Sequence, residues 1–161
     1  MKPTVRDPVT AYVALGANLG DAQRTVVQAL ESLAALPSTQ LLRSSRLYRT
    51  APFEAQGPDF INAVAQIETC LTAPALLQAL QTLENEAGRE RPYANAPRTL
   101  DLDLLMFGQS SMQSARLNLP HPRWRERAFV LRPLADLAPE LVTQADWARV
   151  SSQAIALVTQ S

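Results

Sequence analysis

Two aspartates in the segment TLDLDLLMF are the residues best suited to chemistry. Asp101 and Asp103 are two positions apart and alternate with leucine, and alternate side chains of a β-strand project from the same face. Adjacent carboxylates repel each other unless a cation lies between them. Mg²⁺ takes one or two protein carboxylates and completes its shell with water and substrate phosphates. The spacing indicates a magnesium and phosphate site, although acidic pairs also occur on plain solvent-facing strands.

Arginine is concentrated around this pair. Residues 89–132 carry 8 Arg and 4 acidic residues, residues 1–88 carry 6 basic and 8 acidic residues, and residues 133–161 carry 1 and 3. The whole chain has 15 basic and 15 acidic residues, so its formal net charge is zero. A guanidinium group matches two phosphate oxygens at once. A local excess of Arg in a neutral chain favours a small anionic ligand over a long polyanion.

Several other kinds of chemistry lack their motifs. The sequence has neither GxxxxGK(S/T) nor GxGxxG after its first predicted strand, so side chains and a cation would have to hold any nucleotide phosphates. The only histidine, His121, cannot build a multi-histidine metal site, but it can donate to a phosphate or make one hydrogen bond in a loop. The only cysteine, Cys70, cannot form an internal disulfide and has no basic neighbour, which predicts a reducing, cytoplasmic compartment and no covalent catalysis.

The periodicity of apolar residues predicts the elements that position these groups. The expected strands are residues 9–15, 40–48, 60–69 and 99–107, and the expected helices are residues 22–35 and the stretch between Thr72 and Gly88. Loops are expected at 50–59 and 89–98, followed by a polar hairpin. A third helix is expected to start at the apolar end of HPRWRERAFVLRPL, and the segment after Leu141, which ends in VSSQAIALVTQS, is expected to be a packed helix. The order strand, helix, strand, strand, helix, strand is the split βαβ arrangement. It predicts an α+β protein with a ferredoxin-like α/β/α sandwich, an antiparallel sheet and mobile loops over the site, all in one domain over residues 1–161.

Alternation assigns faces to two of the strands. On residues 60–69 the core face is expected to hold Ile61, Ala63, Ala65 and Ile67, leaving a half-buried strand. Leu100, Leu102, Leu104 and Met106 are expected to fill the face opposite the aspartates. Phe60 and Asn62 alternate after a loop that contains Phe53, and Phe129 follows the Arg run. Aromatic rings beside an amide suit a flat heterocycle, although aromatic residues more often belong to the core.

Five motifs, in this order and spacing, resemble those of a known enzyme family. GANLGD, YRTAPF, DFINAV, PRTLDLDLL and PHPRWRERAFVL are similar to segments of the 6-hydroxymethyl-7,8-dihydropterin pyrophosphokinase family of folate biosynthesis, and the resemblance extends to about Leu141. It implies a ferredoxin-like fold and transfer of the β,γ-diphosphate of ATP to the hydroxymethyl group of the pterin, with release of AMP.

The resemblance also implies roles for individual residues. Asp101 and Asp103 would hold two Mg²⁺ ions, with Asp103 near the attacking hydroxyl. The positions implied for the pterin are Thr50, Pro52, Phe53, Phe60, Asn62 and Phe129; those implied for ATP are Gln81, Glu84, Arg91, Arg116, His121 and Arg127. Arg89 and Arg98 would act from a mobile, phosphate-handling loop. Asn95 and Ala96 stand where many members have Trp-Gly, so ring stacking from this loop is not expected.

Three other functions remain open at this point. The fold class also serves RNA recognition, but the sequence lacks the aromatic RNA-stacking segment, and Asp101 and Asp103 would repel a phosphate backbone. A Mg²⁺-dependent kinase or nucleotidyltransferase with a different product would use the same acidic pair. A pterin or nucleotide sensor would keep the pocket without the rate. The expected partners are the pterin and ATP, without nucleic acid or membrane, and the expected state is a monomer.

Overall fold

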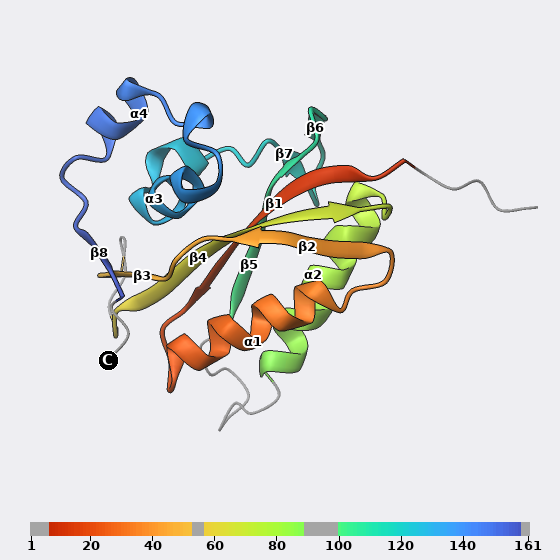
Figure 1. Cartoon of the computed structure of the whole chain (residues 1–161), viewed down its shortest axis with the longest axis horizontal. Helices are drawn as coiled ribbons and strands as arrows, with labels where there is room; N and C mark the ends of the chain where they lie inside the picture. The colour runs from red at the N-terminus through yellow and green to blue at the C-terminus, as the bar shows by residue number, and fades with distance from the viewer. Residues whose placement is uncertain (1–6, 53–56, 89–99, 159–161) are drawn as a thin grey trace, which may run out of the picture.

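The computed structural model describes residues 7–52, 57–88 and 100–158 (Figure 1). Its main sheet joins six strands in antiparallel pairs in the order β5-β1-β4-β3-β8, with β2 also paired to β4. The strands are β1 (Val9–Ala17), β2 (Thr39–Ser44), β3 (Tyr48–Thr50), β4 (Phe60–Thr69), β5 (Asp101–Phe107) and β8 (Ile155–Leu157), and β6 (Met112–Gln113) pairs with β7 (Asn118–Leu119) in a separate hairpin. The helices are α1 (Ala22–Ala34), α2 (Ala73–Ala87), α3 (Ala128–Leu137) and α4 (Gln144–Arg149), with 3₁₀ turns at Trp124–Glu126 and Pro139–Leu141.

The order β1-α1-β2/β3-β4-α2-β5 confirms the predicted α+β, ferredoxin-like fold. Thr72 caps α2 as expected, because its hydroxyl accepts a hydrogen bond of 3.1 Å from the Ala75 N–H. Among the described residues, no helix is long and apolar enough to cross a lipid bilayer.

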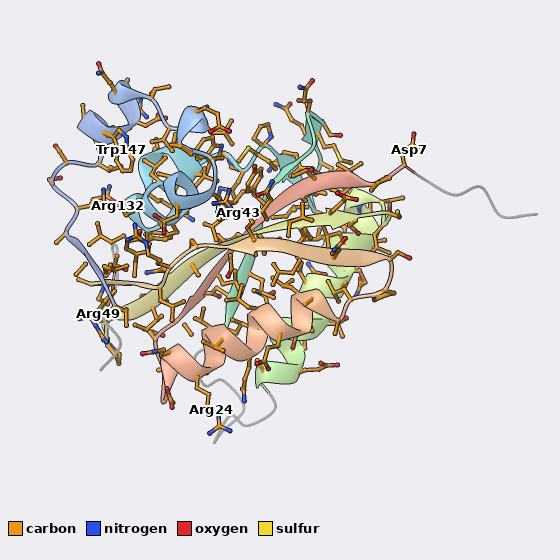
Figure 2. The ribbon with its side chains drawn as sticks, viewed as in Figure 1. Asp7, Arg24, Arg43, Arg49, Arg132 and Trp147 are labelled. Atoms are coloured by element: carbon orange, nitrogen blue, oxygen red, sulfur yellow. The ribbon has the colours of Figure 1, made fainter. Side chains whose placement is uncertain are left out.

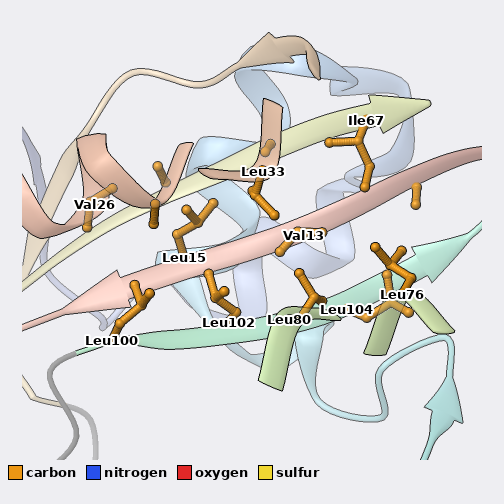
Figure 3. Packing of buried hydrophobic residues seen from close by; sticks show 14 of the residues in the cluster. Val13, Leu15, Val26, Leu33, Ile67, Leu76, Leu80, Leu100, Leu102 and Leu104 are labelled. Atoms are coloured by element: carbon orange, nitrogen blue, oxygen red, sulfur yellow. The ribbon is translucent and has the colours of Figure 1, made fainter. Parts of the chain in front are cut away.

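Helices cover both faces of the sheet. On one face, α1 and α2 pack onto β1, β4 and β5, where Figure 3 shows buried Val13, Leu33, Ile67 and Leu80 in one layer. On the other face, α3 and the 3₁₀ turn at Trp124 bury a second cluster that includes Val64. The expectation of a half-buried strand at residues 60–69 is therefore wrong, because α3 covers the face that was expected to meet solvent.

The predicted continuous strand at residues 40–48 is two strands. Ser44 of β2 pairs with Ala65, and Tyr48 of β3 pairs with Asn62. The chain therefore advances four residues from Ser44 to Tyr48, while β4 advances only three between their partners. Between them, the Ser45 hydroxyl accepts a hydrogen bond of 2.9 Å from the Val64 N–H. The Ser45 side chain thus takes the place of a backbone acceptor, and the Val64 N–H keeps a hydrogen bond where the strand is interrupted.

The bulge in β5 changes which residues face the core. Val13 pairs with Leu104 and Tyr12 with Met106, so Leu105 has no cross-strand partner on β1. Leu105 and Met106 both pack into the cluster beneath α3. Phe107 packs on the opposite face of the sheet, in the same cluster as Leu104. Met106 was therefore assigned to the wrong face. The acidic pair precedes the bulge and keeps its alternation.

The segment after Leu141, expected to be a packed helix, forms the short helix α4 and then a strand that was not expected. Residues Ile155–Leu157 pair with β3, with Thr50 opposite Ile155, and the Val158 N–H donates to the Leu47 carbonyl at 2.9 Å. The free edge of β3 offers these backbone groups partners that a short isolated helix would lack.

Candidate active site

A cavity of about 200 Å³ opens against the face of the sheet that α3 also covers. It brings together seven of the predicted site residues: Thr50, Phe60, Asn62, Asp101, Asp103, Arg127 and Phe129. The other lining residues are Ala14, Leu15, Gly16 and Ala51. Side chains from four separate strands and from the start of α3 therefore converge on one space.

Gly16 lies at the centre of this arrangement. In the sheet it is the cross-strand partner of Asn62 on β4 and of Asp101 on β5. A Cβ atom on Gly16 would lie 3.2 Å from the Asn62 Oδ1 atom, so the missing side chain leaves room between the amide and the carboxylate. Gly16 was not among the predicted site residues, although a glycine within a β-strand often marks a close approach to a ligand.

Asn62 is held in one orientation by a neighbouring strand. Its side chain is buried, and its Nδ2 atom donates a hydrogen bond of 2.8 Å to the Thr50 hydroxyl. The amide thus keeps a carbonyl oxygen and a second N–H for other partners. An amide fixed in this way can read the edge of a heterocycle that both donates and accepts hydrogen bonds.

Asp101 and Asp103 lie opposite small residues of β1. Asp101 pairs with Gly16 and Asp103 with Ala14, so the residues of β1 beside them are small. Between them, the Leu102 N–H donates a hydrogen bond of 2.9 Å to the Glu84 carboxylate, which reaches β5 from α2. Because β5 is an edge strand, this bond occupies an N–H on its outer side and fixes the strand at the acidic pair.

Arg127 and Phe129 form a wall at the start of α3. The guanidinium carbon of Arg127 lies 5.5 Å from the centroid of the Phe129 ring, within the range of a cation–π contact. Both residues line the cavity that contains the acidic pair. A cation and two carboxylates therefore share the space with aromatic rings.

His121 lies beside this site, where its surroundings disfavour the charged form of the ring. Burial lowers its pKa, Arg127 and Arg123 lower it further, and Asp103 acts in the opposite direction. Its Nδ1 atom accepts a hydrogen bond of 3.1 Å from the Arg123 N–H. The neutral ring thus carries its proton on Nε2, which can donate to an anion.

Among the described residues, the other predicted site residues are not part of the lining of this cavity. Pro52 lines an adjacent hollow of about 230 Å³ that shares Thr50 and Phe129 with it. Gln81 and Glu84 lie on α2, and Arg116 lies between β6 and β7. Phe53, Arg89, Arg91 and Arg98 fall outside the described residues, as do the whole predicted loop at residues 89–98 and residues 53–56 of the predicted loop at 50–59.

Part of the Arg excess serves the fold. Arg125 pairs with buried Asp146 of α4 and lies 4.2 Å from the ring of Trp124. Arg132 lies 6.0 Å from the ring of Trp147 (Figure 2). These contacts join α3 and α4 to the 3₁₀ turn, so the charge count alone overstated the number of arginines available to an anion.

Metal binding would rest on the acidic pair. Within residues 7–52, 57–88 and 100–158, no group of three or more His, Cys, Asp or Glu side chains is placed to bind a metal ion. Two carboxylates in a cavity with space for phosphate oxygens nevertheless match the way Mg²⁺ binds with a nucleotide.

Comparison with solved structures supports the fold. A chain described as HPPK-DHPS in complex with substrates matches with a TM-score of 0.68 at 12% identity, covering 91% of this chain and 43% of that one. An HPPK-DHPS of Plasmodium falciparum matches with a TM-score of 0.66 at 13% identity, covering 83% of this chain and 40% of that one. This chain thus spans less than half the length of either.

Comparison with known sequences gives the family. A 2-amino-4-hydroxy-6-hydroxymethyldihydropteridine pyrophosphokinase of Pseudomonas aeruginosa is 47% identical over 131 residues, which cover 81% of each chain. The enzyme of that name in Haemophilus influenzae is 43% identical over 135 residues, covering 83% of this chain and 84% of that one. The family model for 7,8-dihydro-6-hydroxymethylpterin-pyrophosphokinase (HPPK) matches residues 12–139. This chain therefore belongs to the 7,8-dihydro-6-hydroxymethylpterin-pyrophosphokinase family.

Proposed function

We propose that this chain carries out the reaction for which its family is named. It transfers the β,γ-diphosphate of ATP to the hydroxymethyl group of 6-hydroxymethyl-7,8-dihydropterin and releases AMP, a step of folate biosynthesis. The observation that carries this proposal is the single cavity in which Asp101 and Asp103 lie beside a fixed amide and two phenylalanines. The reaction brings a heterocycle and a polyphosphate together, so its site needs both aromatic and amide groups for the ring and carboxylates that hold a cation for the phosphates.

The apolar part of the cavity suits the pterin. Phe60 and Phe129 would flank the ring, while Asn62 offers its carbonyl oxygen and its second N–H to the pyrimidine edge. Thr50 fixes that amide. Pro52 in the adjacent hollow, together with Phe53, would complete the binding segment.

The acidic part suits Mg²⁺ bound to the triphosphate. Asp101 and Asp103 would hold the two ions that the family resemblance implies. When bound, Mg²⁺ neutralises phosphate charge and aligns the transferred group. By the family resemblance, Asp103 would lie on the side of the attacking hydroxyl. Glu84 fixes the strand that carries both carboxylates.

The remaining groups would bind ATP. Arg127 brings a positive charge into the cavity, and the neutral His121 ring provides a donor beside it. The ATP positions implied by the resemblance are Gln81, Glu84, Arg91, Arg116, His121 and Arg127, with Arg89 and Arg98 acting on the transferred diphosphate. Catalysis by such a set rests on positioning and charge stabilisation, because no protein nucleophile is required.

We further propose that one domain over residues 1–161 acts as a cytoplasmic monomer. Light scattering of the purified chain, with and without both substrates, tests the monomer.

The decisive assay mixes the chain with Mg²⁺, ATP and 6-hydroxymethyl-7,8-dihydropterin and identifies the nucleotide released by chromatography. AMP that appears only with the pterin supports diphosphate transfer. ADP would instead show an ordinary kinase, and tight binding of both ligands without turnover would show a sensor. Binding to RNA that falls steeply with salt would favour the nucleic-acid alternative.

A further inference from the structure

The segment after residue 139 lies outside the family match, yet it lines the hollow that adjoins the proposed pterin site. After α4 the chain turns at residues 150–153 and enters β8. Gln153, in this turn, makes two side-chain hydrogen bonds to the wall that carries Arg127 and Phe129. Its Oε1 atom accepts from the Ala128 N–H at 2.9 Å, and its Nε2 atom donates to the Glu126 carbonyl at 2.9 Å.

These two bonds hold the peptide groups on both sides of Arg127. The Glu126 carbonyl belongs to the peptide before Arg127, and the Ala128 N–H belongs to the peptide after it. One planar amide therefore fixes the backbone from which the Arg127 side chain leaves. The backbone N–H of Gln153 donates to the Val150 carbonyl at 2.9 Å, which anchors the turn that holds the amide.

The start of α3 depends on this long-range contact. The first N–H groups of a helix have no partner within the helix, and Arg127 at the N-cap position makes no side-chain capping bond. Gln153 supplies the acceptor from 25 residues further along the chain. Phe129, the second residue of the helix, is thereby placed in the cavity.

The same segment also pairs with the strand that orients the Asn62 side chain. Ile155, two residues after Gln153, pairs with Thr50 of β3, and Thr50 accepts the hydrogen bond that orients Asn62. A short stretch of chain thus connects the wall formed by α3 to the wall formed by β3.

We propose that Gln153 is a positioning residue for the pterin site: its amide sets the backbone at Arg127 and the place of the Phe129 ring. The proposal rests on the proposed function for the identity of the ligand. It predicts that Gln153→Ala weakens pterin binding about five- to tenfold, the range expected for losing one helix cap or hydrogen bond. It also predicts a fall in kcat, because Arg127 moves with the same backbone.

Thr143→Ala is the matched control. Thr143 caps α4 through a hydrogen bond of 3.1 Å from the Asp146 N–H, so its loss weakens the same C-terminal segment without removing a contact to Glu126 or Ala128. Gln153→Glu is the conservative variant, because it keeps the acceptor for Ala128 and loses the donor to Glu126. We expect wild-type pterin affinity for Thr143→Ala and intermediate affinity for Gln153→Glu.

The experiment measures pterin binding by calorimetry, kcat and KM for each substrate, and Tm for all four proteins. Exchange of the Ala128 amide hydrogen, followed by NMR without ligand, provides a readout that does not depend on the reaction. Faster exchange and weaker pterin binding in Gln153→Ala, with neither change in Thr143→Ala, would support the proposal. Equal loss of pterin affinity in Gln153→Ala and Thr143→Ala at matched Tm, or unchanged Ala128 exchange, would overturn it. Failure of the proposed function has a different signature, since the wild-type chain itself would then release no AMP or bind no pterin.

Discussion

Asn62 and Thr50, on neighbouring strands, form a hydrogen bond that orients a buried amide before any ligand arrives. The Nδ2–Oγ1 distance is 2.8 Å, and only 3% of Asn62 is exposed. Rotating the amide would break this bond and leave a buried donor unsatisfied. A binding partner therefore meets a carbonyl oxygen and an N–H whose positions are already set, which lowers the entropic cost of recognition.

Thr50→Val tests this orientation. Valine keeps the shape of threonine but removes the acceptor, so we expect the free energy of unfolding to fall by about 1–3 kcal/mol and pterin affinity to fall with it. Urea denaturation and calorimetric titration measure the two effects. Thr50→Ser keeps the hydroxyl and serves as the control. Wild-type stability and affinity in Thr50→Val would show that the amide is held by other contacts.

Gly16→Ala separates binding from stability. The new Cβ would lie 3.2 Å from the Asn62 Oδ1 atom, so the amide must shift by a few tenths of an ångström. Alanine also loses less conformational entropy than glycine on folding, worth about 0.4–1 kcal/mol where the backbone permits it. We expect a stability within about 1 kcal/mol of the wild type and a pterin KM raised several-fold. An unchanged KM would mean that Asn62 does not read the pterin.

Asp101→Asn and Asp103→Asn test the proposed metal ligands. Each change removes a charge while keeping the shape, so the fold and Tm should be retained, whereas turnover should fall about a hundredfold or more. Glu31→Gln, on the exposed side of α1, is the control for loss of one acidic charge. Near-normal rates for either aspartate variant at saturating Mg²⁺ would remove that residue from the metal site.

Asp136 predicts how stability changes with pH. Burial opposes ionisation of this carboxyl group, but hydrogen bonds from Arg46 and Tyr48, at 2.8 Å each, outweigh it and hold its pKa below the usual value. A lowered pKa in the folded state means that the stabilisation is present above the unfolded value of about 3.9 and is lost as the pH falls through the folded value.

The corresponding measurement compares the wild type with Asp136→Asn by urea denaturation at several pH values. We expect the wild type to be more stable by roughly 1 kcal/mol at pH 7 and the difference to shrink below about pH 4. Because other carboxyl groups titrate in both proteins, the difference between the two curves isolates Asp136. A difference that stays constant down to pH 2 would contradict this assignment.

The sequence was sufficient for the fold class and for most of the described cavity. Alternation put Asp101 and Asp103 on one face of a strand, and the family resemblance added Thr50, Phe60, Asn62, Arg127 and Phe129, which the structure brings together. Their grouping in one cavity could be predicted because it depends on local periodicity or on motifs that are specific in combination.

Other features depended on contacts that no local pattern contains. The bulge at Leu105 and the break at Ser45 are set by register against other strands. The C-terminal segment forms a strand because β3 has an edge to share, and its apolar residues alone suited a helix equally well. Gly16 gains its importance only from its two cross-strand partners, Asn62 and Asp101.

The pairing of β8 with β3 also sets an order of events during synthesis. Thr50 emerges from the ribosome roughly a hundred residues before Ile155, its partner in the sheet. At ~5–20 residues per second this interval lasts about 5–20 s. In the last part of this interval, the nascent chain already has Asn62, Asp101 and Asp103. It still lacks Gln153 and the strand that pairs with Thr50. Substrate is therefore unable to stabilise the growing chain through a finished site, and folding must proceed without that help until the last described strand is in place.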